Sequence, residues 1–216
     1  MNTESAREQM VEQQVRTWDV FDPDVLDAIR SVPRDHYVPE KYRDCAYADG
    51  EVLLDHGQCM LRPSLCGRIL QALNIKGEDA VLEIGTGSGY LTHCLAILGA
   101  TVTSVDLYPD FIDSAKKHLE TSGISNVQLA CMDASQSLPS GAFDAIAITC
   151  AVESDVDKFV DVLKPGGRLF VVTGESPVMK AKLITRQDDG SLVEDELFET
   201  DIPAMVTEAK PPVFSF

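Results

Sequence analysis

The sequence predicts an α/β fold in which a doubly wound, mostly parallel sheet is covered by helices on both faces. Short apolar, β-branched segments alternate with helical segments from Ala80 onward, and such alternation is typical of parallel sheets. A glycine-rich turn joins the first of these strands to its helix, which is where such sheets bind ligands. We expect seven strands, the last two forming an antiparallel hairpin, and a helical and loop region before the sheet.

The region before the sheet, residues 1–76, is expected to form a helical and loop appendage packed on the sheet domain. Its predicted helices are residues 4–17, 22–29 and 63–77. The second begins at Asp22, a good N-cap residue, followed by Pro23 at the first helical position. Residues 31–63 contain several prolines and glycines and are expected to be rich in turns.

The second region, residues 77–216, is expected to be the ligand-binding domain. Its predicted strands are residues 80–84, 101–106, 127–131, 143–149 and 168–174. The helices between them are predicted at residues 90–98, 109–121 and 156–163. Two further apolar segments flank Asp188-Asp189-Gly190, a sequence typical of a tight hairpin turn, so the sheet should end in an antiparallel hairpin.

The charge balance excludes several classes of partner. The 216 residues include 18 basic and 35 acidic side chains, a formal net charge of −17. Binding to nucleic acids and anionic membranes depends on Lys and Arg, so neither partner is expected.

No apolar stretch approaches the roughly 20 residues that cross a bilayer, and the N-terminus lacks the apolar core of a secretory signal. We therefore expect a cytoplasmic protein.

The six cysteines and four histidines do not resemble a metal site or a disulfide framework. No CxxC or HxxxH pair occurs, whereas structural zinc sites use spacings of this kind. We expect reduced, buried thiols and no bound metal.

The glycine-rich turn reads Gly85-Thr86-Gly87-Ser88-Gly89. Glycine allows the backbone to approach a ligand closely, and a helix N-terminus offers free N–H groups to an anion. The dinucleotide fingerprint GxGxxG requires glycine at position 90, which is Tyr90 here, and the turn lacks the GK[ST] ending of a P-loop. A dinucleotide and a nucleoside triphosphate are therefore disfavoured. A purely structural tight turn remains an alternative for these glycines.

Two carboxylates follow later strands. Asp106 ends the second strand, about 20 residues after the glycine turn, where a carboxylate can accept hydrogen bonds from ribose hydroxyls. Asp133 follows the third strand, where an adenine edge could be bound. Their ordinary alternatives are a helix cap and a turn residue. With the turn, they suit a nucleoside without a pyrophosphate, such as S-adenosylmethionine, whose cationic sulfonium would be favoured by the nearby Glu83.

Five segments resemble, in order, the S-adenosylmethionine-binding motifs of class I methyltransferases: VLEIGTGSGYLT (81–92), VTSVD (102–106), CMDA (131–134), FDAIAITCAV (143–152) and LKPGGRLFVV (163–172). Residues 10–63 are similar to the protein-L-isoaspartate O-methyltransferase family, in the segments VLDAI, VPRDHYVP, YRDCAYAD and HGQ. The resemblance covers roughly residues 10–175. It implies a Rossmann-like class I methyltransferase fold, a role in protein repair, and methyl transfer from S-adenosylmethionine to a protein or peptide carboxylate, with S-adenosylhomocysteine as product.

The resemblance also implies which residues form the site. Cofactor contacts are implied for Glu83, Gly85, Thr86, Gly87, Ser88, Gly89, Tyr90, Asp106, Leu107, Asp133, Ala134 and Thr149. Acceptor contacts are implied for His56, Gln58, Cys59, Met60 and Leu61.

The chain departs from the family where the acceptor is aligned. The family motif has the form GQTISQP, with its serine beside the transferred methyl group. Here residues 57–63 read GQCMLRP, so Leu61 occupies the serine position and no catalytic residue is assigned. Arg62 replaces the family's glutamine and either attracts an acidic acceptor or is an ordinary solvated charge. The family's TAAAP segment reads TCAVE at residues 149–153.

Methyl transfer to a carboxylate can proceed, at a lower rate, without the serine hydroxyl. A carboxylate acceptor is already ionised at pH 7, so methyl transfer needs alignment and not a general base. Losing one hydrogen bond to a charged group costs on the order of 1.5–3 kcal/mol, which slows transfer roughly 10- to 150-fold if fully expressed. Three interpretations stay open: a weak isoaspartyl methyltransferase, a methyltransferase with a small-molecule acceptor, and a cofactor-binding protein without catalysis. A dehydrogenase ranks last because of Tyr90.

Overall fold

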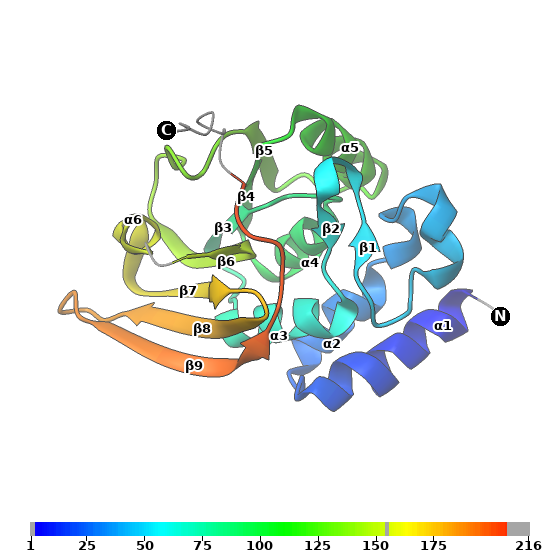
Figure 1. Cartoon of the computed structure of the whole chain (residues 1–216), viewed down its shortest axis with the longest axis horizontal. Coiled ribbons are helices and arrows are strands. Elements are labelled where there is room, and N and C mark those ends of the chain that lie inside the picture. The colour runs from blue at the N-terminus through cyan, green and yellow to red at the C-terminus, as the bar shows by residue number, and fades with distance from the viewer. Residues whose placement is uncertain (1–2, 154–155, 207–216) are drawn as a thin grey trace, which may run out of the picture.

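The computed structural model of the chain describes residues 3–153 and 156–206. Within them a seven-stranded sheet has the order β5-β4-β3-β6-β7-β8-β9 (Figure 1). The strands are β3 (Ala80–Ile84), β4 (Thr101–Asp106), β5 (Val127–Cys131), β6 (Phe143–Val152), β7 (Leu163–Glu175), β8 (Val178–Arg186) and β9 (Leu192–Thr200). Strands β3 to β7 pair in parallel, whereas β8 is antiparallel to both neighbours. The predicted mostly parallel sheet with a terminal antiparallel hairpin is confirmed.

The order in which successive strands are added to the sheet reverses beside β3. From β3 the chain proceeds outward through β4 to β5, and it then returns to β6 on the other side of β3. Leu82 of β3 pairs in register with Thr103 of β4 and with Ile146 of β6. In open parallel sheets, ligands bind outside the carboxyl ends of the strands at such a reversal, so the topology places a site after Ile84.

Helices cover both faces of the sheet (Figure 1). They are α1 (Thr3–Met10), α2 (Pro23–Ser31), α3 (Pro63–Leu73), α4 (Tyr90–Leu98), α5 (Pro109–Thr121) and α6 (Asp157–Asp161). Successive strand residues face opposite sides: Val81 joins an apolar core with α3 and α4, and Leu82 joins a second core with α6. None of the described helices is long and apolar enough to cross a bilayer.

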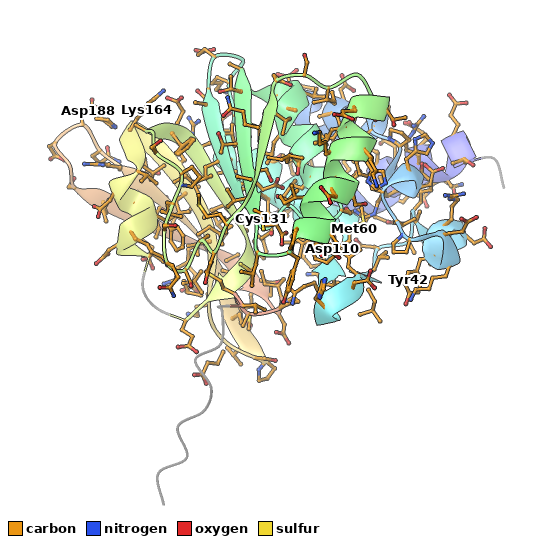
Figure 2. The ribbon with its side chains drawn as sticks, turned by 90° about the horizontal axis from the view of Figure 1, so that it is seen from above. Tyr42, Met60, Asp110, Cys131, Lys164 and Asp188 are labelled. Carbon is orange, nitrogen blue, oxygen red and sulfur yellow. The ribbon has the colours of Figure 1, made fainter. Side chains whose placement is uncertain are left out.

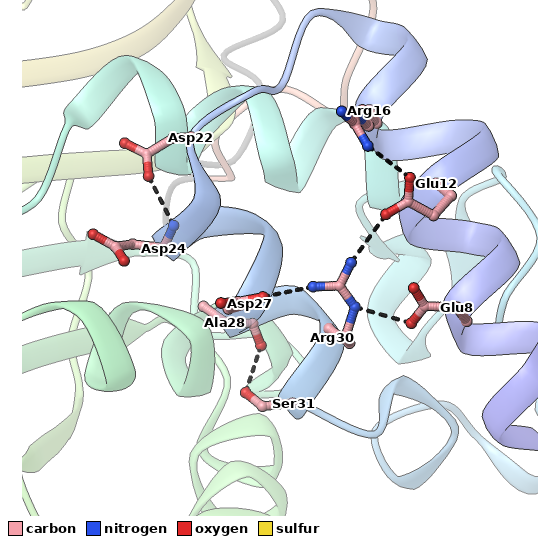
Figure 3. A network of polar contacts seen from close by, with 9 residues as sticks. All are labelled: Glu8, Glu12, Arg16, Asp22, Asp24, Asp27, Ala28, Arg30 and Ser31. Atoms are coloured by element: carbon pink, nitrogen blue, oxygen red, sulfur yellow. Dashed lines mark hydrogen bonds and ion pairs between the residues drawn. The ribbon is translucent and has the colours of Figure 1, made fainter.

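The helical appendage begins with the predicted first helix, which is irregular. Helix α1 continues into a π-helical turn (Val11–Val15) and a 3₁₀ turn (Arg16–Trp18). Arg30 of α2 connects α2 to this first helical segment through ion pairs with Glu8 and Glu12, at 2.9 and 3.0 Å (Figure 3). The predicted Asp22 cap is present, because its carboxylate accepts a hydrogen bond from the Asp24 N–H at 2.9 Å.

Several predicted boundaries are wrong. Helix α3 ends at Leu73 and not near Gly77, because Asn74 adopts the left-handed conformation (φ 45°) and its N–H bonds back to Leu70 and Gln71. Helix α6 is shorter than residues 156–163, because Leu163 already pairs with Phe143 in the sheet.

The turn-rich segment contains short regular elements that the sequence pattern does not indicate. Two 3₁₀ turns span Arg34–His36 and Glu40–Cys45. Strands β1 (Val52–Leu53) and β2 (Cys59–Met60) then form a small antiparallel hairpin around the 3₁₀ turn Asp55–Gly57. This hairpin lies in front of the sheet domain (Figure 1).

The division into 1–76 and 77–216 stays a prediction, and residues 1–2, 154–155 and 207–216 of these two parts lie outside the described residues. Both parts contribute to one apolar core, in which Ile29 and Leu65 pack with sheet residues such as Phe170. The six cysteines are unpaired, as expected. Cys66 and Cys94 are buried and Cys59 and Cys150 are partly buried, but the expectation of buried thiols is wrong for Cys45 and Cys131, which are exposed because they lie at the ends of the 3₁₀ turn Glu40–Cys45 and of β5.

Candidate functional site

An open cavity, which encloses about 670 Å³ of space including solvent, lies at the carboxyl ends of β3 to β6, the edge of the sheet where such folds bind ligands. We call it the main cavity. Its walls come from the glycine turn, the ends of the strands, the start of α5, the β1–β2 hairpin and the segment after β9. The lining residues are Leu54, Gln58, Cys59, Ile84, Gly85, Gly87, Val105, Asp106, Leu107, Tyr108, Phe111, Met132, Asp133, Ala134, Thr149, Cys150, Pro203, Met205 and Val206.

The glycine turn is held tightly against β6 and α5. Gly85 has φ +97°, and a side chain there would collide with the Thr149 hydroxyl. That hydroxyl donates to the carbonyls of Ile84 and Gly85, both at 2.9 Å. Gly89 has φ +85°, and a Cβ there would lie 2.9 Å from Ala115 of α5. Both positions therefore require glycine for structural reasons, and the ligand-binding role of the turn stays a prediction.

Most N–H groups of the turn bond inside the protein. Gly85 and Thr86 donate to the Val105 carbonyl, at 2.9 and 3.2 Å, and Gly89 donates to Thr86. Gly87 donates to the Asp106 carboxylate at 2.8 Å. The sequence suggested that these N–H groups bind an anion. In the fold, most of them instead donate hydrogen bonds that hold the turn against β4.

Asp106 organises the turn from the end of β4. Its Oδ2 accepts from Gly87 and its Oδ1 accepts from the Tyr108 N–H at 3.0 Å. The side chain lines the main cavity yet is 8% exposed, and burial raises the pKa of its carboxyl. Each oxygen has a second lone pair for a ligand hydroxyl.

Asp133 and its neighbours form the wall beyond Asp106. Asp133 Oδ1 accepts from the Ser135 N–H at 2.8 Å, which is an ordinary turn contact, and the residue also lines the main cavity. Leu107, Met132 and Ala134 surround it with apolar surface. This wall therefore combines one carboxylate with a flat apolar surface suited to a nucleobase.

Glu83 lies beneath the turn and does not line the main cavity. Its side chain is fully buried, and Oε2 accepts from Thr92 and Ser104 at 2.5 and 2.6 Å. Burial raises the pKa of its carboxyl to about 8, so near pH 7 the group is mostly neutral. The expected contact between this acid and a sulfonium is therefore not seen: strand geometry directs the side chain toward Ser104 and away from the cavity.

A second cavity of about 320 Å³ adjoins the main one and shares four of its residues, namely Cys59, Gly85, Gly87 and Thr149. We call it the adjoining cavity. Its other lining residues are Met60, Leu61, Cys66, Thr86, Ser88, Tyr90 and Leu91. The segment expected to contact an acceptor is thus brought against the glycine turn.

Leu61 forms apolar wall where the related family has serine. Its side chain is 6% exposed, and its carbonyl accepts from the buried Arg34 guanidinium at 2.7 Å. Arg34 also lies 4.8 Å from the centre of the Tyr90 ring, which packs edge-on against Tyr37. Burial raises the pKa of the Cys59 thiol to about 12, so this thiol is neutral.

Two of the expected acceptor residues take different positions. Gln58 lines the main cavity, while His56 lines neither cavity and instead packs on Tyr108 and bonds to Asp110. Arg62 also lies outside both cavities, because its guanidinium stacks 4.5 Å from the Trp18 ring centre.

Other lining residues were missed from the sequence. Tyr108 and Phe111 follow Asp106 at the start of α5 and could have been found from that proximity. The segment 203–206 could not, because it reaches the site only by folding back: Ala151 of β6 donates to the Pro203 carbonyl and accepts from the Met205 N–H, both at 2.8 Å. The residues that the structure describes contain no group of three or more potential metal ligands.

Sequence comparisons match this chain to one family. A family model described as protein-L-isoaspartate(D-aspartate) O-methyltransferase matches residues 5–208. The protein-L-isoaspartate O-methyltransferase of Methanoculleus marisnigri is 37% identical over 183 residues, which cover 84% of this chain and 83% of that protein. The enzyme of the same name from Methanospirillum hungatei is 36% identical over 184 residues, covering 85% of each chain.

Solved structures share the fold. A Plasmodium falciparum structure, described as a protein-L-isoaspartate O-methyltransferase in complex with S-adenosyl-L-homocysteine, superposes with a TM-score of 0.81 at 23% identity and covers 93% of this chain and 98% of its own. Another structure, named protein-L-isoaspartate O-methyltransferase, has a TM-score of 0.79 at 26% identity, covering 92% of this chain and 65% of its own.

Proposed function

This chain belongs to the protein-L-isoaspartate(D-aspartate) O-methyltransferase family, and from that premise we propose that it transfers a methyl group from S-adenosylmethionine to a carboxylate of a protein or peptide, isoaspartyl side chains above all. One observation carries the proposal. The main cavity, with its carboxylates, and the adjoining cavity, with the family's acceptor segment, meet at the glycine turn and share Cys59, Gly85, Gly87 and Thr149.

The residues of the main cavity fit this cofactor. The turn positions that face it lack side-chain bulk, and Gly87 lines both cavities with φ +51°. Asp106 offers acceptor lone pairs for ribose hydroxyls, and Asp133 offers them for an adenine amino group, beside the apolar Ala134. When bound, the cofactor supplies an electrophilic methyl group on a sulfonium.

The residues of the adjoining cavity align the acceptor and exclude water. Met60, Leu61 and Leu91 provide its apolar surface. No general base is needed, because the acceptor carboxylate is ionised at pH 7, and the rate depends on the alignment of the two reacting groups. Because Leu61 cannot donate a hydrogen bond, we propose an isoaspartyl methyltransferase that is slower than a serine-containing one.

The test is methylation of an isoaspartyl peptide with methyl-labelled S-adenosylmethionine, with the same peptide carrying ordinary aspartate as control. We expect base-labile methyl ester on the isoaspartyl peptide only. Leu61→Ser should raise the rate roughly 10- to 150-fold, the value of one hydrogen bond to a charged group. Absence of ester with both the wild type and the serine variant would refute isoaspartyl activity.

A small carboxylic acid is the second candidate acceptor, favoured by the apolar walls that Met60, Leu61 and Leu91 give the adjoining cavity. Turnover of apolar carboxylic acids without turnover of the peptide would support it. Tight binding of S-adenosylhomocysteine without turnover of any acceptor would instead indicate a cofactor-binding protein without catalysis.

We also propose that the protein works in the reducing cytoplasm. The six unpaired cysteines support this location, since thiols exposed to oxidising compartments usually form disulfides. Fractionation of the source cells tests it, and recovery in a secreted fraction would contradict it.

A further inference from the structure

The geometry points to His56 as a positioning residue that fastens the tip of the β1–β2 hairpin over the main cavity and, through Tyr108, sets how fast the nucleoside cofactor enters and leaves. The inference rests on the proposed function, because it takes an adenosine-containing ligand as the occupant of that cavity. It gives His56 a role other than the acceptor contact implied by the family resemblance.

The hairpin tip, residues 54–58, forms one side of the main cavity. Its turn is closed by hydrogen bonds between Leu54 and Gln58 (2.9 Å) and between Gln58 and Asp55 (3.1 Å). Leu54 and Gln58 line the cavity. The Leu54 side chain also reaches the glycine turn, since a Cβ on Gly87 would lie 3.6 Å from Leu54 Cδ1.

The opposite side of the cavity is formed by the start of α5. Tyr108 and Phe111 both line it, and their rings pack edge-on with centres 5.5 Å apart. Both residues therefore act as wall for any ligand that Asp106 and Asp133 hold, and a displacement of Tyr108 opens that wall.

His56 joins these two sides. Its ring stacks on Tyr108 with centres 4.0 Å apart and planes 3° from parallel, and it meets Phe111 edge-on at 5.5 Å. Its Nε2 lies 3.0 Å from both carboxylate oxygens of Asp110. Figure 2 shows Asp110, at the start of α5, beside the hairpin that carries Met60.

The backbone of the tip is shaped for this contact. His56 has φ +57°, a left-handed conformation that is uncommon for residues other than glycine, although Asn, Asp and His are enriched there. The His56 side chain is 39% exposed and lines neither cavity. It therefore packs against Tyr108 from outside the two cavities.

The contacts of His56 join the hairpin tip to the start of α5, while His56 itself lines neither cavity. Small-molecule sites enclose most of their ligand's surface, so exchange requires the tip and α5 to separate. Weakening the His56 contacts should therefore ease passage in both directions. A residue that touched the ligand itself would change the dissociation rate and the affinity together, and the two roles can be separated by kinetics.

The decisive variant is His56→Asn, because Asn also tolerates the left-handed backbone while removing the ring. Surface plasmon resonance with S-adenosylhomocysteine on the full chain measures both rate constants. We expect association and dissociation to accelerate together, about five- to tenfold for the loss of one ring stack and one exposed hydrogen bond, with Kd changed less than about threefold. Asp110→Ala should give part of this effect, and the double variant should be no faster than His56→Asn.

Asp55→Asn is the matched control, since Asp55 lies on the same exposed turn and makes no ion pair among the described residues; its rates should equal those of the wild type. Unchanged rates in both His56→Asn and Asp110→Ala would overturn the inference, as would a rise in Kd with association unchanged. Failure of the wild type to bind S-adenosylhomocysteine would instead refute the proposed function, and the inference with it.

Discussion

Asp106 offers a sharp test of the cofactor site, because its two expected roles can be measured separately. In the protein alone, its carboxylate accepts hydrogen bonds from the N–H groups of Gly87 and Tyr108, at 2.8 and 3.0 Å. In the proposed complex, its remaining lone pairs accept from the ribose. Asp106→Ala removes all of these contacts, whereas Asp106→Asn keeps one acceptor oxygen and the side-chain volume.

The magnitudes follow from these contacts. Leaving the two partly buried N–H groups of Gly87 and Tyr108 without their acceptor costs about 1–3 kcal/mol each, so Asp106→Ala should lower the free energy of unfolding by roughly 2–6 kcal/mol. Losing two ribose hydrogen bonds to a charged acceptor costs on the order of 3 kcal/mol or more, which weakens cofactor binding at least about 100-fold. Asp106→Asn should lie between the wild type and the alanine variant in both respects.

Calorimetric titration with S-adenosylhomocysteine measures the affinity, and urea unfolding without ligand measures the stability. Each variant is titrated below its own unfolding transition, so that loss of folded protein is not mistaken for loss of binding. An affinity within about threefold of wild type in a folded Asp106→Ala protein would remove Asp106 from the cofactor site. Its carboxylate would then serve only to hold the glycine turn.

Two other residues give predictions of a different kind. Burial raises the pKa of Glu83 from 4.5 to about 8, so the folded state binds this proton more tightly than the unfolded state does; the resulting stability is complete below about pH 4.5 and is lost as the pH rises through about 8. Wild type should therefore lose a few kcal/mol of stability relative to Glu83→Gln between pH 5 and pH 8. Urea unfolding of both proteins at each pH measures this difference. Parallel curves of stability against pH would contradict the raised pKa of Glu83. Tyr37→Phe removes the buried hydrogen bond between the Tyr37 hydroxyl and His93 Nδ1, at 2.5 Å. It should lower the free energy of unfolding by about 1–2 kcal/mol in the same assay. Tyr42→Phe, at a partly buried position, is the control and should change this free energy by less than about 0.5 kcal/mol.

The sheet domain could be predicted well because its signals are local. The bounds of β3, α4, β4, α5 and β5 coincide with the predicted ones. Each strand is a short apolar run that ends at glycine, proline or a polar residue, and each helix begins or ends at such a residue. The glycine turn and Asp106 could be located for the same reason, since strand ends of a parallel sheet meet at one edge.

The hairpin and the directions of single side chains could not be predicted. Strands β1 and β2 contain two residues each, too few for a periodic pattern. Glu83 lies two residues before the turn, and only the pairing of β3 with β4 shows that its carboxyl meets Ser104 and not the cavity. His56 likewise reaches Asp110 across 54 positions of sequence.

The sequence by itself determined the order of the strands and helices, the glycine turn, the acidic residues at the strand ends and the family's acceptor segment with its leucine. Each of these depends on neighbouring residues and on backbone preferences that act over a few positions. Only the tertiary structure decided that the hairpin tip and residues 203–206 complete the cavity, that His56 packs on Tyr108, and that Glu83 is buried and mostly neutral. The physical reason is that these features arise from contacts between distant segments and from burial, which depend on how the whole chain packs.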